Sequence, residues 1–194
     1  AEARLIRPVA PRRRSCEKRA VHDFFATAAK GTEGALRDEL RALRLRDVRA
    51  DRGGVHFRGP LEDGMRACLW SRTAMRVLLS LGTHEARGAD GLYQAVGAIP
   101  WEEHLSARRT FAVHATVRSS ALTHSHFVAL RAKDAIVDRM RARTGARPAV
   151  DTRAPDVHVI VHLAKDRAAI SLDISGDPLH RRGWRVEAKE APLR

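Results

Sequence analysis

Hydrophobic and polar positions near the start of the chain change their spacing from one segment to the next. The apolar residues of segment 23–29 predict a buried strand. Leu36, Leu40 and Leu43 follow at helical spacing, so they share one face of a predicted helix, with Thr32 as its candidate N-cap. The regular part of the chain therefore opens with a strand that leads directly into an amphipathic helix.

The next segment predicts a hairpin, a second helix and a further strand. Residues 47–51 and 55–58 flank a Gly-Gly pair, which is typical of a tight turn between two strands. Pro60 favours the start of a helix, and residues 76–82 predict a strand. The residues expected to face inward from this helix are Leu61, Met65, Cys68 and Leu69. The order strand, helix, strand, strand, helix, strand predicts a ferredoxin-like unit.

A second mixed α/β unit follows the glycines Gly88 and Gly91. Its predicted elements, in order, are a short helix that ends at Pro100-Trp101, a strand over 110–117, a long helix over 124–144, and two strands over 157–163 and 168–174. The fold class expected from the whole pattern is α+β, with two small units in succession.

Composition and charge narrow the range of partners. The 194 residues are 44% hydrophobic and 30% charged, with a formal net charge of +13 and a pI of about 11.2. This basic excess favours nucleic acid before membrane, although the abundance of Arg and Ala also fits a merely basic surface. Cys16 and Cys68 form no CxxC pair, and the chain has neither a signal peptide nor a membrane-spanning run, so we expect a cytoplasmic protein with no membrane partner.

No catalytic or metal-binding signature stands out. The sequence contains no GxGxxG, no P-loop and no GxSxG. His158 and His162 lie on one face of a predicted strand, about 13 Å apart by strand rise, which is too far to share an ion. Asp173, Ser175 and Asp177 are most simply polar turn residues. We therefore expect no catalytic residue, no metal and no cofactor in this chain.

One lysine of the long predicted helix stands among apolar residues. Lys133 projects near the centre of a face formed by Ala129, Leu130, Ile136, Val137 and Met140. An ammonium group in that position is costly unless it snorkels to water or finds a partner. Snorkelling at the edge of the helix is one interpretation, and a lysine held by a carboxylate or aimed at a phosphate is the other.

The C-terminal segment gathers cations around one aromatic residue. His180, Arg181, Arg182 and Arg185 surround Trp184. Guanidinium groups pair with phosphates and an indole ring stacks on bases, so the segment is a candidate RNA contact. An Arg-rich surface turn is the alternative.

Several stretches, taken in order, carry a resemblance. They are FFATAAKGTE at 24–33, LWSRTAMRV at 69–77, KDAIVD at 133–138, GARP at 145–148 with VD at 150–151 and PD at 155–156, and LDISG at 172–176 leading to HRRGWR at 180–185. The chain resembles, over roughly residues 22–194, a family of bacterial methyltransferases that modify guanine N2 in large-subunit rRNA. Trp184 stands where that family usually has Tyr.

The resemblance implies a domain organisation. The run of like charges at the N-terminus predicts a basic, poorly ordered tail at 1–21. The resemblance implies a ferredoxin-like domain at 22–85, a THUMP RNA-binding domain at 86–176, and a basic segment with the start of a linker at 177–194. It further implies that a Rossmann domain, which binds S-adenosylmethionine and carries the catalytic motif, is absent from this chain and follows it.

The resemblance also implies the function. The chain would be the substrate-recognition portion of an rRNA (guanine-N2) methyltransferase, inactive alone, with 23S rRNA and the downstream methyltransferase domain as partners. The candidate RNA contacts are Lys133, Arg147, His180, Arg181, Arg182, Trp184 and Arg185.

Three alternatives remain open at this point. The two units could be a scaffold that orients a catalytic domain, or the RNA-binding part of a tRNA-modifying enzyme. A small independent enzyme that uses the ferredoxin-like fold as acylphosphatases do would need an Arg and Asn pair, and the sequence contains no Asn.

Overall fold

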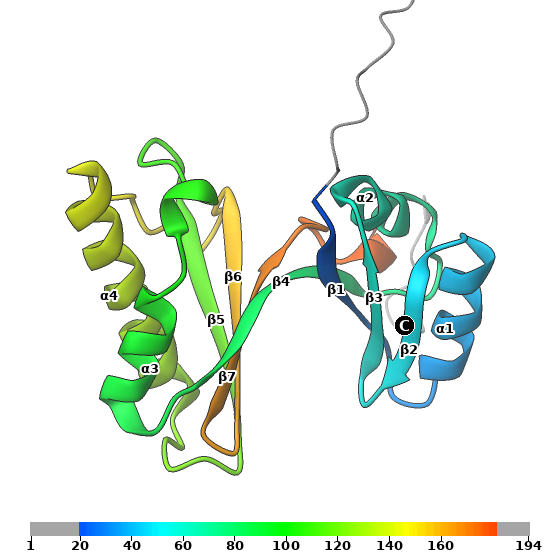
Figure 1. Ribbon diagram of the computed structural model, residues 1–194, viewed down its shortest axis with the longest axis horizontal. Helices are drawn as coiled ribbons and strands as arrows, with labels where there is room; N and C mark the ends of the chain where they lie inside the picture. Colours follow the sequence, from blue (N-terminus) through cyan, green and yellow to red (C-terminus); the bar gives the residue numbers. More distant parts are fainter. Residues whose placement is uncertain (1–19, 182–194) are drawn as a thin grey trace, which may run out of the picture.

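A seven-stranded mixed sheet runs through the computed structural model, which describes residues 20–181 (Figure 1). The strand order is β2-β3-β1-β4-β7-β6-β5, with β5 and β6 parallel and the other neighbours antiparallel. The strands are β1 (His22–Thr27), β2 (Arg46–Asp51), β3 (Gly54–Gly59), β4 (Arg76–Glu85), β5 (Phe111–Arg118), β6 (Val157–Ala164) and β7 (Arg167–Asp173). The expected α+β class is confirmed.

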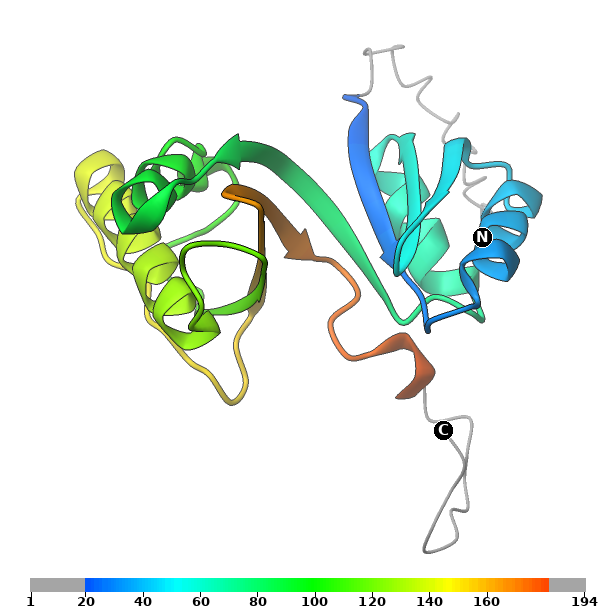
Figure 2. The same ribbon diagram turned by 90° about the horizontal axis from the view of Figure 1, so that it is seen from below.

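Two pairs of helices cover the two ends of this sheet (Figure 2). They are α1 (Glu33–Ala42) and α2 (Leu61–Trp70) at one end, α3 (Gly88–Gly97) and α4 (Ser125–Thr144) at the other, with short 3-10 turns η1 (Trp101–Glu103) and η2 (Leu179–Arg181). The long helix ends where expected, at Gly145, whose φ of 70° suits the left-handed C-cap that glycine adopts freely. None of the helices in residues 20–181 combines the length and apolar character that crossing a membrane requires.

Strand β4 belongs to both halves of the molecule. Its residues 76–79 pair with β1, whereas residues from Leu78 to Glu85 pair with β7. The order β1, α1, β2, β3, α2, β4 confirms the predicted ferredoxin-like succession. Because a single ten-residue strand serves both halves, hydrogen bonds connect them across one continuous sheet.

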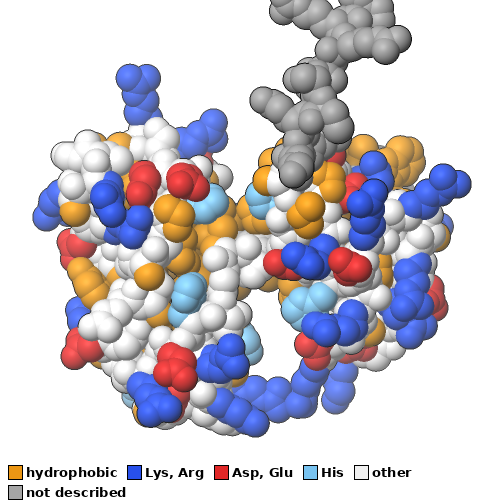
Figure 3. Space-filling view, in the orientation of Figure 1, with side chains coloured by type: hydrophobic (Ala, Val, Ile, Leu, Met, Phe, Trp, Pro, Cys, Tyr) orange, Lys and Arg blue, Asp and Glu red, His pale blue; other side chains and the backbone are white. Residues whose placement is uncertain are grey.

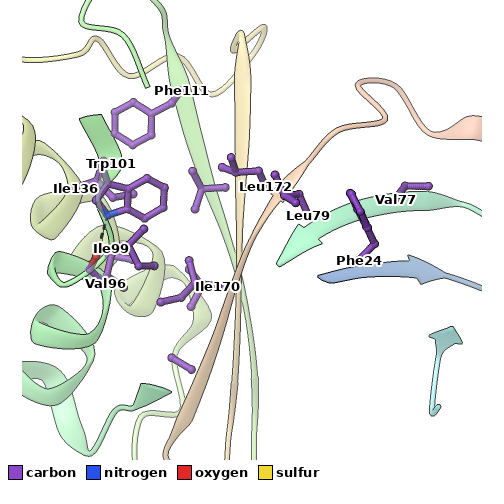
Figure 4. Close-up of a cluster of buried hydrophobic side chains, with 14 of the residues drawn as sticks. Phe24, Val77, Leu79, Val96, Ile99, Trp101, Phe111, Ile136, Ile170 and Leu172 are labelled. Atoms are coloured by element: carbon purple, nitrogen blue, oxygen red, sulfur yellow. Dashed lines mark hydrogen bonds between the residues drawn. The ribbon is translucent and has the colours of Figure 1, made fainter. Parts of the chain in front are cut away.

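The helices of both halves cover the same face of this sheet. Phe24 of β1 lies opposite Leu79, Leu79 opposite Leu172, and Leu172 opposite Val159, so these side chains project to one side. All four are buried and belong to one hydrophobic cluster, which extends to Trp101 beneath α4 (Figure 4). The core is therefore continuous from one end of the molecule to the other.

The chain returns to the first half after β7. Ile174 donates its backbone N–H to the carbonyl of Val77 at 3.0 Å, and Leu179 donates to the carbonyl of Met75 at 2.9 Å. This return segment, residues 174–181, is a second connection between the halves beside β4. It places η2 next to α2 (Figure 1).

The predicted inward face of α2 is wrong for three of its four residues, and only Cys68 is partly buried against the core. Leu61, Met65 and Leu69 are 38%, 57% and 66% exposed, whereas Asp63, Gly64 and Ala67 are buried. Hydrophobicity alone would turn the helix the other way. The observed orientation follows from the close packing of Gly64 against the ring of Phe24. The predicted inward Leu36 and Leu40 of α1, in contrast, are confirmed as buried.

Candidate nucleic-acid interface

One face of the sheet is not covered by any described helix, and we call it the open face. Register places its side chains in rows across four strands. The rows are Leu78, Asp173, His158 and Ala112; then Ser80, Ser171, Ile160 and His114; then Thr83, Ala169, His162 and Thr116; and finally Glu85, Arg167, Ala164 and Arg118. The part of the open face over β4, β7, β6 and β5 is therefore composed mainly of imidazole, hydroxyl and small side chains, with arginines at one end.

Three histidines of the open face lie on β5 and β6. His114 Nε2 and His158 Nδ1 are 3.2 Å apart, and the two rings stack with centroids 5.3 Å apart. His162 Nδ1 lies 2.7 Å from the hydroxyl of Thr116. Burial lowers the pKa of His114, and the neighbouring His158 and the cation Arg76 act in the same direction. His114 is therefore biased toward its neutral form, in which a ring nitrogen can accept a hydrogen bond.

The first half of the molecule adds a ring pair and cations to the same face. Phe25 of β1 contacts the ring of His56 on β3 with centroids 4.7 Å apart. Arg58 Nε lies 2.8 Å from Asp23 Oδ1 on the neighbouring strand. His56 Nε2 lies 3.3 Å from Asp51 Oδ2. This part of the face thus offers flat ring surface next to a partly neutralised guanidinium.

An ion pair lies on the open face where the two halves of the molecule meet. Arg76 Nη1 pairs with Asp173 Oδ2, and the carboxylate of Asp173 is fully buried. Asp173 Oδ1 also accepts the backbone N–H of Ser175 at 2.9 Å, and Arg76 Nη1 donates to the carbonyl of Gly176 at 3.2 Å. A buried carboxylate needs these partners. Asp173 and Ser175 therefore hold the start of the return segment, as polar turn residues do.

Free cations lie at the far end of the open face. Arg118 and Arg167 are both exposed, and no salt bridge within residues 20–181 involves either of them. The space-filling view shows a hollow between the two lobes, with histidine side chains along both of its sides (Figure 3). Phosphates pair with cations, and unstacked bases stack on rings and bond to polar edges. The open face offers both kinds of group.

The structure divides the predicted RNA contacts into two separate groups. Lys133 lies on α4 and Arg147 follows that helix, whereas His180 and Arg181 lie in η2 beside α2, at the opposite end of the molecule (Figure 1). Arg182, Trp184 and Arg185 lie outside the described residues. The predicted contacts within residues 20–181 are thus not brought into one site, and their role in RNA binding stays a prediction.

Lys133 has a carboxylate partner. Its Nζ lies 2.7 Å from Asp134 Oδ1, and its side chain remains partly exposed. The apolar stripe predicted around it is only partly correct, since Ile136, Val137 and Met140 are buried but Leu130 is 44% exposed. The helix buries a face that includes Val128 and Ala132 instead. Lys133 thus lies at the margin of the buried face, where its ammonium group both reaches solvent and pairs with the carboxylate of Asp134.

Sequence reasoning overlooked the histidine pair of the open face. The same-face placement of His158 and His162 was predicted from their spacing, but His114 comes 44 residues before His158. Alternation along β5, with exposed His114, Thr116 and Arg118, is the signal that marks this face. Across residues 20–181, no three His, Cys, Asp or Glu side chains are grouped so that they could hold a metal ion.

Comparisons with known proteins agree with this architecture. Residues 23–78 match the RlmL ferredoxin-like domain, and residues 86–173 match the THUMP domain. The ribosomal RNA large subunit methyltransferase K/L of Syntrophotalea carbinolica is 53% identical over 171 residues, which are 88% of this chain and 24% of the relative. The protein of the same name from Pseudomonas aeruginosa is 45% identical over 174 residues, again 24% of its length.

A solved structure shows the same fold. The crystal structure of a predicted N6-adenine-specific DNA methylase from Listeria monocytogenes superposes with a TM-score of 0.80 at 31% identity, covering 90% of this chain and 46% of the other. The present chain spans about a quarter of the length of the curated relatives it matches. With its ferredoxin-like domain followed by a THUMP domain, the chain belongs to the family of ribosomal RNA large subunit methyltransferase K/L, of which it matches the N-terminal part.

Proposed function

We propose that this chain is the RNA-binding, substrate-recognition portion of an S-adenosylmethionine-dependent rRNA (guanine-N2) methyltransferase with 23S rRNA as its substrate. The observation that carries the proposal is the open face, a helix-free sheet surface with rings, hydroxyls and free cations in a THUMP-containing chain. Structured RNA is recognised mostly through its shape, its phosphates and its exposed bases, for which such a surface is suited.

The methyl donor is assigned to another part of the protein. Residues 20–181 contain no GxGxxG turn between a strand and a helix, which is the usual cradle for a nucleotide cofactor. We propose that S-adenosylmethionine is bound outside the described residues, in the part of the protein that corresponds to the remainder of the relatives' length. In this proposal the present chain positions the RNA and takes no part in methyl transfer.

The salt dependence of RNA binding tests the proposal first. We expect the affinity of the chain for a structured 23S rRNA fragment to fall steeply as salt is added, because each phosphate contact releases counterions. Fluorescence anisotropy over a salt series measures this slope. Affinity that does not change with salt contradicts the proposal, and equal affinity for tRNA in competition contradicts the assignment to rRNA.

A matched pair of substitutions then locates the interface. His162→Glu places a negative charge in the middle of the open face, so we expect about tenfold weaker binding, equivalent to about 1.4 kcal/mol. His126→Glu makes the same change at an exposed position in the first turn of α4, on the covered side of the sheet, and should leave the affinity close to that of the parent. Equal losses of RNA affinity in both variants would show that the open face is not the contact surface.

The contacts proposed for η2 and α4 are tested in the same assay. Arg181→Ala together with Arg182→Ala should weaken binding if the C-terminal cations reach RNA, and Lys133→Ala and Arg147→Ala test the other end of the molecule. A loss confined to the η2 substitutions would place RNA at the end of the sheet next to α2. A loss confined to Lys133→Ala and Arg147→Ala would place RNA at α4, on the covered side, and would contradict the open face as the contact surface.

A further inference from the structure

The apolar stripe on α2 is an anomaly that RNA binding does not explain. Leu61, Met65 and Leu69 are spaced four residues apart, so they form one row along the solvent side of this helix. A large exposed apolar group on a folded protein marks a contact surface, and an apolar row offers nothing to a phosphate backbone. The chemistry of the stripe therefore indicates a protein partner.

Close packing on the inner side of α2 makes this exposure unavoidable. A Cβ added to Gly64 would lie 2.5 Å from Cε1 of Phe24 and 2.9 Å from Cδ1 of Ile174, so only glycine allows the helix to approach this closely. Asp63 on the same side lies against Gly59, where an added Cβ would come within 2.2 Å of Oδ2. The helix cannot roll its apolar row inward without giving up these contacts.

The return segment extends the stripe into a groove. Met65, Cys68 and Leu69 form one side of the groove, and Ile174, Pro178 and Leu179 form the other. Arg181, the last described residue, also lines it. The polypeptide that continues past Arg181 thus begins at the apolar surface itself, so whatever it is joined to is held at a high effective concentration there.

We infer that the stripe and groove of α2 are the docking surface for the methyltransferase portion of the same protein. The relatives supply the length of chain needed, since this chain matches only 24% of the Syntrophotalea carbinolica protein and 46% of the Listeria monocytogenes chain. The inference rests on the proposed function, and it adds where the catalytic portion is seated. Docking there would fix its orientation relative to the open face.

Oxidative footprinting of Met65 tests this inference without any substitution. Hydroxyl radicals oxidise exposed methionine to its sulfoxide, so mass spectrometry reports how accessible Met65 is. We expect Met65 to react readily in the 194-residue chain and to lose most of that reactivity in the full-length protein, while exposed Phe127 on α4 reacts equally in both. Equal reactivity of Met65 in the two proteins overturns the inference.

A second arm separates docking from self-association. Protection of Met65 that increases with the concentration of the 194-residue chain alone would assign the surface to a second copy and overturn the inference. In the full-length protein, Leu61→Glu with Met65→Glu should increase the radius of gyration measured by X-ray scattering, whereas Leu130→Glu, at an exposed leucine of α4, should not. An unchanged radius in the double variant also overturns it.

Binding of S-adenosylmethionine and of the rRNA fragment is measured on the same full-length sample. Protection of Met65 without either activity refutes the proposed function but leaves an intramolecular contact on α2 standing. Both activities with an unprotected Met65 refute the docking surface alone.

Discussion

At the scale of single residues, the carboxylate of Glu39 connects two parts of the first half through several hydrogen bonds. Its carboxylate accepts hydrogen bonds from the hydroxyl of Ser71 at 2.8 Å, the N–H of Arg72 at 2.8 Å, and the N–H and hydroxyl of Thr73 at 3.2 and 2.5 Å. Burial by itself would raise the pKa of Glu39, but these donors outweigh it and lower the pKa to about 2. Glu39 thereby ties α1 to the loop between α2 and β4.

Glu39→Gln should destabilise the chain, because an amide presents one acceptor oxygen where the carboxylate presents two. We expect a loss of about 1–3 kcal/mol in the free energy of unfolding at neutral pH, measured by urea denaturation. The contribution of the ionised carboxylate is fully present above pH 4.5 and is lost as the pH falls toward about 2. The variant should therefore show a weaker decline of stability over this range.

The exposed carboxylate Glu85 provides the control for this experiment. Glu85→Gln should leave both the stability at neutral pH and the acid decline close to those of the parent. If Glu39→Gln retains the full decline, the four donors do not hold the pKa of Glu39 down.

At the scale of elements, the orientation of α2 depends on a glycine rather than on its hydrophobic residues. Gly64 lies against the ring of Phe24, which stacks on Phe57 with centroids 4.9 Å apart. The sequence of α2 by itself predicts that Leu61, Met65 and Leu69 face the core. Periodicity identifies an apolar stripe, but it does not show which surface the stripe faces, because that depends on the shape of a distant strand.

Gly64→Ala should destabilise the chain despite the better helix propensity of alanine. The new methyl group would overlap the Phe24 ring, and we expect a cost of about 1–3 kcal/mol in the free energy of unfolding. Gly34→Ala in α1 is the matched control: an added Cβ meets nothing within 4 Å there, so it should stabilise by up to about 1 kcal/mol. Thermal denaturation of the two variants compares the effects, and stabilisation by both would contradict the packing argument.

At the scale of the whole molecule, the two halves share one sheet and one core. Leu79 of β4 and Leu172 of β7 lie between Phe24 on one side and Trp101 on the other (Figure 4). The return segment adds further hydrogen bonds to the first half, at Val77 and Met75. The two halves are therefore expected to unfold together rather than as independent domains.

Leu79→Ala tests this cooperativity. A truncated leucine at the junction leaves a cavity, and we expect a loss of about 2–5 kcal/mol. Hydrogen exchange should show that amides of β1 and of β6 lose protection together, because both depend on the same core. Leu130→Ala at an exposed site should change stability by less than about 0.5 kcal/mol. Loss of protection confined to one half would show that the halves unfold separately.

The element pattern was largely predictable from the sequence, since periodicity and turn residues are local signals. The strand-helix succession of the first half, the long helix ended by Gly145 and the paired last strands are all present in the structure. The sharing of β4 between the two halves was not predictable from the sequence. The first part of β4 pairs with β1 and the rest pairs with β7, but its alternation of apolar and polar residues is that of any strand. The meeting of His114 with His158 likewise depends on the parallel pairing of β5 with β6.

The sequence by itself determined the identity of the elements, the excess of positive charge and the resemblance that pointed to an RNA-modifying family. These properties depend on neighbouring residues or on composition, so they can be recognised before folding is known. Only the tertiary structure decided which face of the sheet stays open, that α2 turns its apolar row outward, and that the cations at 133 and 181 lie at opposite ends. Each of these depends on contacts between residues far apart in the chain, where packing rather than local preference has the larger free energy.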